Sequence, residues 1–218
     1  MCGFLGQVGF NNPNVDWINE GLEAIKHRGP DSSGVWYSDC QRVVLGHQRL
    51  SIIDLSETGS QPMSFKKHGL TIVFNGEIYN HLEIRKKLSS LGFNDWEGSS
   101  DTETLLKSFA ILGFESTLKN IVGMFSFALY SEKSNKIFLA RDRAGEKPLF
   151  YYLDESSFIF ASELKAIFAN KEIKKKLSPK SFNSFLENGF IAGNQCILEG
   201  FNKLEAGHFA YLDLQNKK

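Results

Sequence analysis

Short β-prone segments joined by turn signals recur along this chain. Residues 121–130 and 136–141 are apolar runs, and the polar tetrapeptide Glu132-Lys133-Ser134-Asn135 between them predicts a β-hairpin. We predict further strands or extended segments at residues 3–10, 34–37, 43–45, 46–54, 70–74, 148–153, 158–161 and 209–212. Helical spacing of apolar residues occurs in separate stretches, at residues 16–26, 81–91, 104–112, 163–169 and 178–186. Hairpin-paired strands with helices apart from them favour a layered α+β fold over a doubly wound parallel sheet.

The composition is that of an ordinary globular chain and excludes several classes of function. The 218 residues are 42% hydrophobic and 23% charged, which suits one large domain. Lys plus Arg and Asp plus Glu both total 25, so the chain lacks the basic surplus of a nucleic-acid-binding protein. No apolar run reaches the roughly 18 residues of a membrane span, and the N-terminus does not have the pattern of a signal peptide. We therefore expect neither nucleic acid nor a membrane as a partner.

The three cysteines, Cys2, Cys40 and Cys196, are widely spaced. They form no C-x-x-C motif, so the sequence predicts neither a metal site nor a disulfide framework. Thiols that stay reduced are typical of cytoplasmic proteins, and we expect a cytoplasmic location. Cys40 and Cys196 are interpreted as free thiols without a special role.

Cys2 directly follows the initiator Met1, and removal of Met1 would expose it as the first residue. The residue would then carry a thiol and a free α-amine on one carbon. An α-amine titrates near ~8, so a sizeable part of it is an unprotonated base at neutral pH. A nucleophile activated by its own terminal amine is an established catalytic arrangement. A cysteine near a terminus is also commonly just a small apolar residue, so Cys2 alone decides nothing.

Three other motifs have a local structural reading. Asn75-Gly76 follows the strand predicted over residues 70–74 and is a tight-turn signal, which predicts a β-turn. Ser100 and Glu103 have the spacing of a capping box at the start of the next helix. Residues 11–14 predict another turn, because they combine three asparagines with a proline.

Eight motifs then occur in one order along the chain. They are Met1-Cys2-Gly3, His27-Arg28-Gly29-Pro30-Asp31, His47-Gln48-Arg49-Leu50-Ser51-Ile52-Ile53-Asp54, Phe74-Asn75-Gly76-Glu77-Ile78-Tyr79-Asn80, Ser100-Asp101, Gly123-Met124-Phe125, the run from Arg141 to Phe150, and Ala161-Ser162-Glu163-Leu164-Lys165. Together they resemble the glutamine-hydrolysing domain of asparagine synthetases, a class II glutamine amidotransferase, from residue 2 to about residue 212. The resemblance implies one domain over residues 1–218 with the four-layer αββα sandwich of N-terminal nucleophile hydrolases.

The resemblance also implies three catalytic residues. Cys2 would be the nucleophile that forms a γ-glutamyl thioester, with its freed amine as the base and later the acid. Asn75 and the backbone amide of Gly76 would form the oxyanion hole. Losing one such donor typically lowers the rate of an enzyme by ~10²–10³.

Five further residues would bind L-glutamine. Arg49 would bind the α-carboxylate, because a planar guanidinium offers two parallel hydrogen bonds. Asp101 would bind the α-ammonium with help from Glu77, and backbone groups around Leu50 and Ile52 would line the pocket. No metal ligand is implied.

Residues near these positions are interpreted mainly as supports. We expect His27, His47 and Asp54 to support the site, whereas Arg28 and Glu77 fit a functional role and a structural ion pair equally well. The loop at residues 141–147 is expected to brace the sheet or to face a second domain. Ala206-Gly207-His208 departs from a Pro-Gly-His that many relatives have, which we expect to alter only a turn.

Asparagine synthetases continue into an ATP-dependent domain that activates aspartate through a Ser-Gly-Gly-x-Asp-Ser type loop, and this chain contains no such loop. The resemblance implies that ammonia passes to a C-terminal synthetase domain or partner subunit that is absent from this chain. It implies no cofactor here, with ATP and magnesium needed only by the synthetase domain. Aspartate is the expected acceptor, although similar amidotransferases amidate sugars. The sequence does not determine the oligomeric state, and a homodimer is one arrangement that it allows.

Two other functions compete with this one. The chain could be an N-terminal nucleophile hydrolase of a different amide, or a regulatory domain that keeps the fold without turnover. Arg49 together with Asp101 favours a free amino acid as substrate, because the pair offers partners for a carboxylate and an ammonium. The presence of Cys2, Asn75 and Gly76 argues against a decayed site, which would be expected to lose at least one of them.

Overall fold

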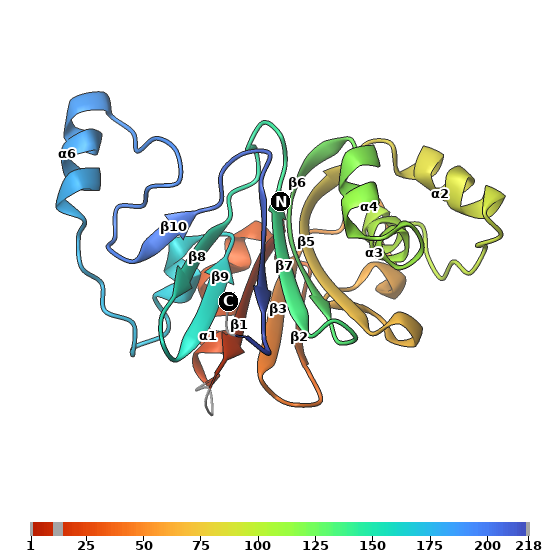
Figure 1. The fold of residues 1–218 in the computed structure, drawn as a ribbon, viewed down its shortest axis with the longest axis horizontal. Helices are drawn as coiled ribbons and strands as arrows, with labels where there is room; N and C mark the ends of the chain where they lie inside the picture. The colour runs from red at the N-terminus through yellow and green to blue at the C-terminus, as the bar shows by residue number, and fades with distance from the viewer. Residues whose placement is uncertain (1, 11–14, 217–218) are drawn as a thin grey trace.

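The computed structural model describes residues 2–10 and 15–216 (Figure 1). Met1 and the turn predicted at residues 11–14 lie outside the described residues. Within the described ranges, no helix combines the length and apolar character that crossing a bilayer requires.

Two antiparallel sheets form the centre of the molecule. The first has the strand order β10 (Phe201–Lys203), β8 (Phe150–Leu153), β9 (Ser157–Ala161), β1 (Gly3–Gly9), β3 (Val43–Arg49) and β2 (Ser32–Tyr37). The second has the order β11 (Phe209–Asp213), β7 (Lys136–Arg141), β6 (Gly123–Ser131), β5 (Leu70–Ile78) and β4 (Met63–Phe65). The predicted hairpin is the pair β6 and β7, with Ser131 opposite Lys136.

Helices cover the outer face of each sheet. Against the first sheet lie α1 (Trp17–Ala24) and α5 (Leu164–Ile167), and against the second lie α2 (His81–Ser90), α3 (Asp101–Leu112) and α4 (Phe114–Asn120). The short 3-10 helices are Lys26–Arg28, Glu57–Gly59 and Lys66–His68. In Figure 1, α6 (Pro179–Asn188) stands apart from these layers.

Three buried clusters hold the four layers together. Strand alternation on β1 places Phe4 between the sheets, in a cluster that includes Val73 of β5, and turns Leu5 toward α1. The cluster on the outside of the second sheet joins Phe127 of β6 to Leu105 of α3. All seven residues of β1 are buried because both faces of the strand are covered. The predicted α+β sandwich with αββα layering is therefore confirmed.

The structure corrects several local predictions. Asn75-Gly76 forms no turn: β5 runs through both residues to Ile78, because β6 pairs with the strand along this whole length. The extended segment predicted over residues 46–54 ends at Arg49, where β3 ends. The helix predicted from residue 104 begins at Asp101, and β4 and α4 were not predicted.

The capping box at α3 is formed only in half. The Oγ of Ser100 accepts a 3.1 Å hydrogen bond from the backbone nitrogen of Glu103. The Glu103 carboxylate instead accepts from the backbone nitrogens of Glu97 and Gly98 and pairs with Lys107. Contacts with the segment before α3 and with Lys107 within it therefore fix the start of the helix. They position Asp101, because Asp101 is the first residue of α3.

Candidate active site

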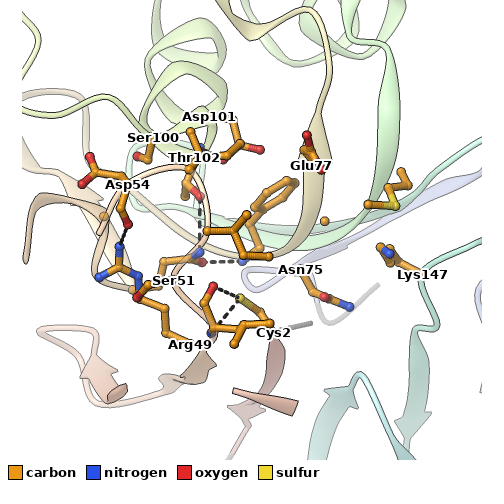
Figure 2. Close-up of a pocket in the computed structure, with 18 residues that line it drawn as sticks. Cys2, Arg49, Ser51, Asp54, Asn75, Glu77, Ser100, Asp101, Thr102 and Lys147 are labelled. Carbon is orange, nitrogen blue, oxygen red and sulfur yellow. Dashed lines mark hydrogen bonds between the residues drawn. The ribbon is translucent and has the colours of Figure 1, made fainter. Parts of the chain in front are cut away.

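One pocket opens where the start of β1, the end of β3, the middle of β5 and the start of α3 meet (Figure 2). All eight residues predicted for the site line it: Cys2, Arg49, Leu50, Ile52, Asn75, Gly76, Glu77 and Asp101. Segments from both sheets and from α3 meet there, so the sandwich brings together residues that are far apart in the sequence. The pocket also contains Gln61, Thr102, Met124 and Lys147, which were not predicted.

Cys2 lies immediately before β1 at the base of this pocket. Its Sγ accepts a 3.3 Å hydrogen bond from the backbone nitrogen of Leu50 and lies 3.6 Å from the Leu50 carbonyl oxygen. Burial raises the pKa of the Cys2 thiol, against the lowering effect of that hydrogen bond and of Arg49. The resting group is therefore a thiol, and a base must remove its proton before it can attack.

Arg28 holds the backbone of Cys2. Its Nε donates a 2.9 Å hydrogen bond to the Cys2 carbonyl oxygen, and its other arm pairs with Glu163 at 2.7 Å. The Glu163 carboxylate also contacts His27 at 3.1 Å and Lys165 at 3.1 Å. Glu163 belongs to a motif that the sequence analysis identified, but its contact with Arg28 was not predicted because the two residues are 135 positions apart.

The edge of β5 that faces the pocket lacks a neighbouring strand. β4 pairs only with Leu70 to Ile72. Beyond Ile72, side chains accept the hydrogen bonds from β5 that a neighbouring strand would otherwise accept. The backbone nitrogen of Phe74 donates to Gln61 Oε1 at 2.7 Å, and that of Ile78 donates to Asp101 Oδ2 at 2.9 Å. In an antiparallel ladder alternate residues direct their N–H groups to the same edge. The N–H of Gly76, midway between these two residues, therefore points into the pocket as well.

The side-chain amide of Asn75 is buried but makes no hydrogen bond with the described residues. Its side chain is fully buried, at 0% exposure, and neither its Nδ2 nor its Oδ1 has a hydrogen-bond partner among the described residues. A buried amide without partners costs about 1–3 kcal/mol, so native proteins rarely keep one without a use for it. Figure 2 shows Asn75 on the same side of the pocket as Cys2.

Gly76 is required by the close approach of β6. A Cβ atom at this position would collide with the carbonyl oxygen of Met124. The absence of a side chain also leaves the backbone N–H accessible from the pocket. Asn75 Nδ2 and the Gly76 N–H thus supply two donors from adjacent residues on one rigid strand, which is the composition of an oxyanion hole.

His47, on β3, contacts the backbone of β5. Its Nε2 lies 3.0 Å from the carbonyl oxygen of Phe74, and an acceptor there requires the proton to be on Nε2. Complete burial lowers the pKa of His47 to about 4, so the ring is neutral. His47 therefore holds β5 and does not serve as the base for Cys2.

Asp101 presents a carboxylate at the first residue of α3. Its two oxygens accept from the backbone nitrogens of Ile78 and Thr102, both at 2.9 Å. Burial raises the pKa of Asp101 to about 6, although these hydrogen bonds lower it, and the charge of Glu77 raises it slightly further. A bound cation would relieve the cost of ionising this buried group, so the site is suited to an ammonium.

Arg49 is buried beside the loop at residues 50–60. Its NH1 donates to the carbonyl oxygen of Ser56 at 2.9 Å, and its NH2 donates to that of Asp54. Each terminal nitrogen carries two N–H groups, so the guanidinium can hold the loop and still bind a carboxylate. The Asp54 carboxylate accepts from Ser56, Thr58 and Ser99 and thereby ties this loop to the segment before α3.

The loop at residues 141–147 braces the second sheet, as predicted. The Asp142 carboxylate accepts hydrogen bonds from the backbone nitrogens of Phe125, Ala144, Glu146 and Lys147. Cys40 and Cys196 are free thiols, also as predicted. Across residues 2–10 and 15–216, no group of His, Cys, Asp and Glu side chains has a geometry that could hold a metal ion.

One pocket thus holds a thiol, two adjacent hydrogen-bond donors and a buried carboxylate, a set of groups that could hydrolyse the amide of an amino acid. The model of a family described as the glutamine amidotransferase domain matches residues 1–218. This chain belongs to that family. Its resemblance to the glutamine-hydrolysing domain of asparagine synthetases is confirmed by individual relatives of this amidotransferase domain.

Two of the relatives whose names contain asparagine synthetase (glutamine-hydrolyzing) illustrate the match. One, from Methanocaldococcus jannaschii, is 38% identical over 237 residues, covering 100% of this chain and 45% of the relative. The other, from Bacillus subtilis, is 42% identical over 182 residues, covering 81% of this chain and 29% of the relative. A third relative of the amidotransferase domain, named amidase chry2, from Gibberella zeae, is 34% identical over 196 residues, covering 89% of this chain and 28% of that protein. The chain spans less than half the length of these curated relatives.

A solved structure gives independent support for the fold. Glutamine phosphoribosylpyrophosphate amidotransferase from B. subtilis, in complex with ADP and GMP, matches with a TM-score of 0.68 and 19% identity. The match covers 97% of this amidotransferase domain and 47% of that chain. At this identity the likeness concerns the fold alone, and it agrees with the layered sandwich described above.

Proposed function

We propose that this domain hydrolyses L-glutamine to L-glutamate and ammonia, with Cys2 as the nucleophile. The observation that carries the proposal is the buried Asn75 amide, which lines the same pocket as Cys2 and has no hydrogen-bond partner among the described residues. The oxyanion that forms when a thiolate attacks a side-chain amide would supply the missing partner. Asp101, in the same pocket, supplies a carboxylate for the α-ammonium of the substrate.

The reaction begins after Met1 is removed. The α-amine of Cys2 takes the thiol proton, and the thiolate attacks the side-chain carbonyl carbon of glutamine. Asn75 Nδ2 and the Gly76 N–H stabilise the tetrahedral oxyanion. The ammonium of Cys2 then returns its proton to the leaving nitrogen, so the C–N bond breaks and ammonia departs. Water, deprotonated by the same amine, cleaves the thioester and releases L-glutamate, and the sulfur recovers its proton.

Arg49 and Asp101 set the specificity in this proposal. Arg49 binds the α-carboxylate and Asp101, beside Glu77, binds the α-ammonium. Backbone groups at Leu50 and Ile52 complete the wall of the pocket. A peptide-linked or acylated glutamine lacks one of the two charges, so it would lose a partner at one end.

The names of the relatives support a proposal for the destination of the ammonia. We propose that a synthetase domain, in a longer chain or a partner subunit, uses the ammonia in an ATP-dependent amidation in the cytoplasm. The relatives named asparagine synthetase make aspartate the expected acceptor. ATP and magnesium would serve that domain, and the glutaminase domain would need no cofactor.

The test is the release of L-glutamate from L-glutamine by the purified chain, after mass spectrometry has shown that Met1 is absent. We expect L-glutamate release from wild type and none from Cys2→Ala. With N-acetyl-L-glutamine or L-glutamine amide, the readout is the corresponding side-chain acid, and we expect little of it. Equal rates on the blocked substrates would favour a hydrolase of a different amide. No release by a correctly processed chain, even with a synthetase partner added, would favour the non-catalytic alternative.

A further inference from the structure

The pocket-facing edge of β5 depends on a side chain that the proposed mechanism does not use. Gln61 lies just before β4, is 8% exposed and lines the pocket. Its Oε1 accepts the 2.7 Å hydrogen bond from the backbone nitrogen of Phe74, directly before Asn75. β4 ends its pairing with β5 at Ile72, so Gln61 takes the place of the next strand residue.

The other end of the same side chain reaches α3. Gln61 Nε2 donates to the Thr102 hydroxyl oxygen at 3.3 Å, and Thr102 follows Asp101 in the first turn of the helix. In Figure 2 this hydrogen bond is the dashed line that ends at Thr102. One buried amide therefore links the strand with the oxyanion donors to the helix turn with the ammonium partner.

We propose that Gln61 is a positioning residue that aims the Asn75 and Gly76 donors at the reacting carbonyl, an inference that rests on the proposed hydrolysis of glutamine. Two backbone N–H groups, those of Phe74 and Ile78, hold the pocket-facing edge of β5 through hydrogen bonds, and we call them its two anchors. Gly76 lies midway between them. Gln61 fixes the first anchor and Asp101 fixes the second. If the first anchor is lost, the Gly76 N–H can rotate away from the position that the oxyanion occupies.

Only an amide of this length meets both requirements. The position needs an acceptor for Phe74 and a donor for Thr102 at the end of a three-carbon stem. Methionine has a similar length and no comparable polar group, so Gln61→Met would leave the Phe74 N–H buried without a partner. A misplacement of about 1 Å in an active site can lower the rate about 100-fold.

The test compares two variants with a control on the same strand. Gln61→Met removes both hydrogen bonds, and Thr102→Val removes only the second. Thr71→Val is the control, because Thr71 is a buried β5 residue whose hydroxyl bonds to Ser64 at 2.9 Å outside the pocket. The readouts are kcat, KM, the Kd for L-glutamate and the hydrogen-exchange rate of the Phe74 amide.

We expect kcat of Gln61→Met to fall about 10- to 100-fold, with KM and the Kd for L-glutamate within about twofold of wild type. The Phe74 amide should exchange faster. Thr102→Val should show a smaller fall in kcat, and Thr71→Val none. This split separates positioning from a merely structural role, which would affect the control and Gln61→Met alike.

Other results would overturn the inference. Gln61→Met with an unchanged kcat, or with a change in KM alone, would show that Gln61 does not aim the donors. If Gln61→Met does not fold, a Thr102→Val enzyme with wild-type kcat and wild-type Phe74 exchange would be equally decisive. A processed wild type without glutaminase activity would contradict the proposed function. Unchanged exchange of the Phe74 amide in Gln61→Met would instead show that Gln61 does not hold the backbone of Phe74.

Discussion

The Nε of Arg28 donates a 2.9 Å hydrogen bond to the carbonyl oxygen of Cys2. The backbone of the nucleophile is thus held by a side chain from the 3-10 helix that follows α1. Arg28 is in turn held by Glu163, at the start of α5, through a 2.7 Å ion pair. The two segments pack against the same sheet, and their ion pair fixes the residue next to the first strand.

Replacing Glu163 should therefore impair catalysis, although Glu163 does not contact the substrate in the proposed mechanism. We expect Glu163→Gln to lower kcat about tenfold, equivalent to ~1.4 kcal/mol in the barrier, because Arg28 loses its charged partner. Lys165→Met is the matched control, since Lys165 contacts the same carboxylate at 3.1 Å but is half-exposed and does not hold Cys2. Steady-state kinetics on both variants measures the difference. Equal losses in the two would contradict the role given to Arg28.

Asn75→Ala should separate activity from stability. We expect kcat to fall by about 10²–10³ with little change in KM, because the donor acts on the oxyanion and not on the bound substrate. The free energy of unfolding should fall by less than a typical core truncation, since the variant also removes a buried amide without a partner among the described residues. Kinetics and urea unfolding of the same preparation provide the two numbers. A large rise in KM with an unchanged kcat would assign Asn75 to substrate binding.

The pH dependence of substrate binding should report Asp101. Burial raises the pKa of its carboxyl group to about 6 in the free protein. Below that pH the group gains a proton and loses its charge, so the substrate ammonium loses its partner and kcat/KM should fall as pH decreases through about 6. Bound ammonium lowers this pKa, and the fall in kcat should begin at a lower pH. In Asp101→Asn the limb near pH 6 should vanish from the kcat/KM profile, with a high KM throughout; a limb that persists would belong to another group.

Gly76→Ala should destabilise the fold as well as the site. A Cβ at this position meets the Met124 carbonyl oxygen, which belongs to the backbone of β6 and cannot move without separating the strands. Overpacking of this kind typically costs about 1–3 kcal/mol. We expect a lower urea midpoint and a loss of glutaminase activity. Gly92→Ala provides a matched comparison for unfolding, because a Cβ at Gly92 meets nothing within 4 Å, although its φ of +87° also makes alanine unfavourable. A Gly76→Ala protein as stable as wild type would show that the backbone of β6 can shift at little cost to accommodate the Cβ atom.

The local sequence determined the elements of this protein and the chemical groups of its pocket. Alternating and helical patterns located most strands and helices, because those patterns depend on neighbours within a few residues. The family resemblance that the ordered motifs carry predicted Cys2, Asn75 and Asp101 as members of one site, and the structure does place them in one pocket.

Tertiary structure decided what those local signals could not. Asn75-Gly76 has the chemistry of a turn, but pairing with β6 overrides it and makes the dipeptide part of a strand whose other edge faces the pocket. Gln61 carries no local signal at all, since its role comes from Phe74 and from a helix turn 41 positions away. The physical reason is that a polar side chain acquires its function from the partners that folding brings to it. Those partners are set by the packing of two sheets, which no short stretch of sequence encodes.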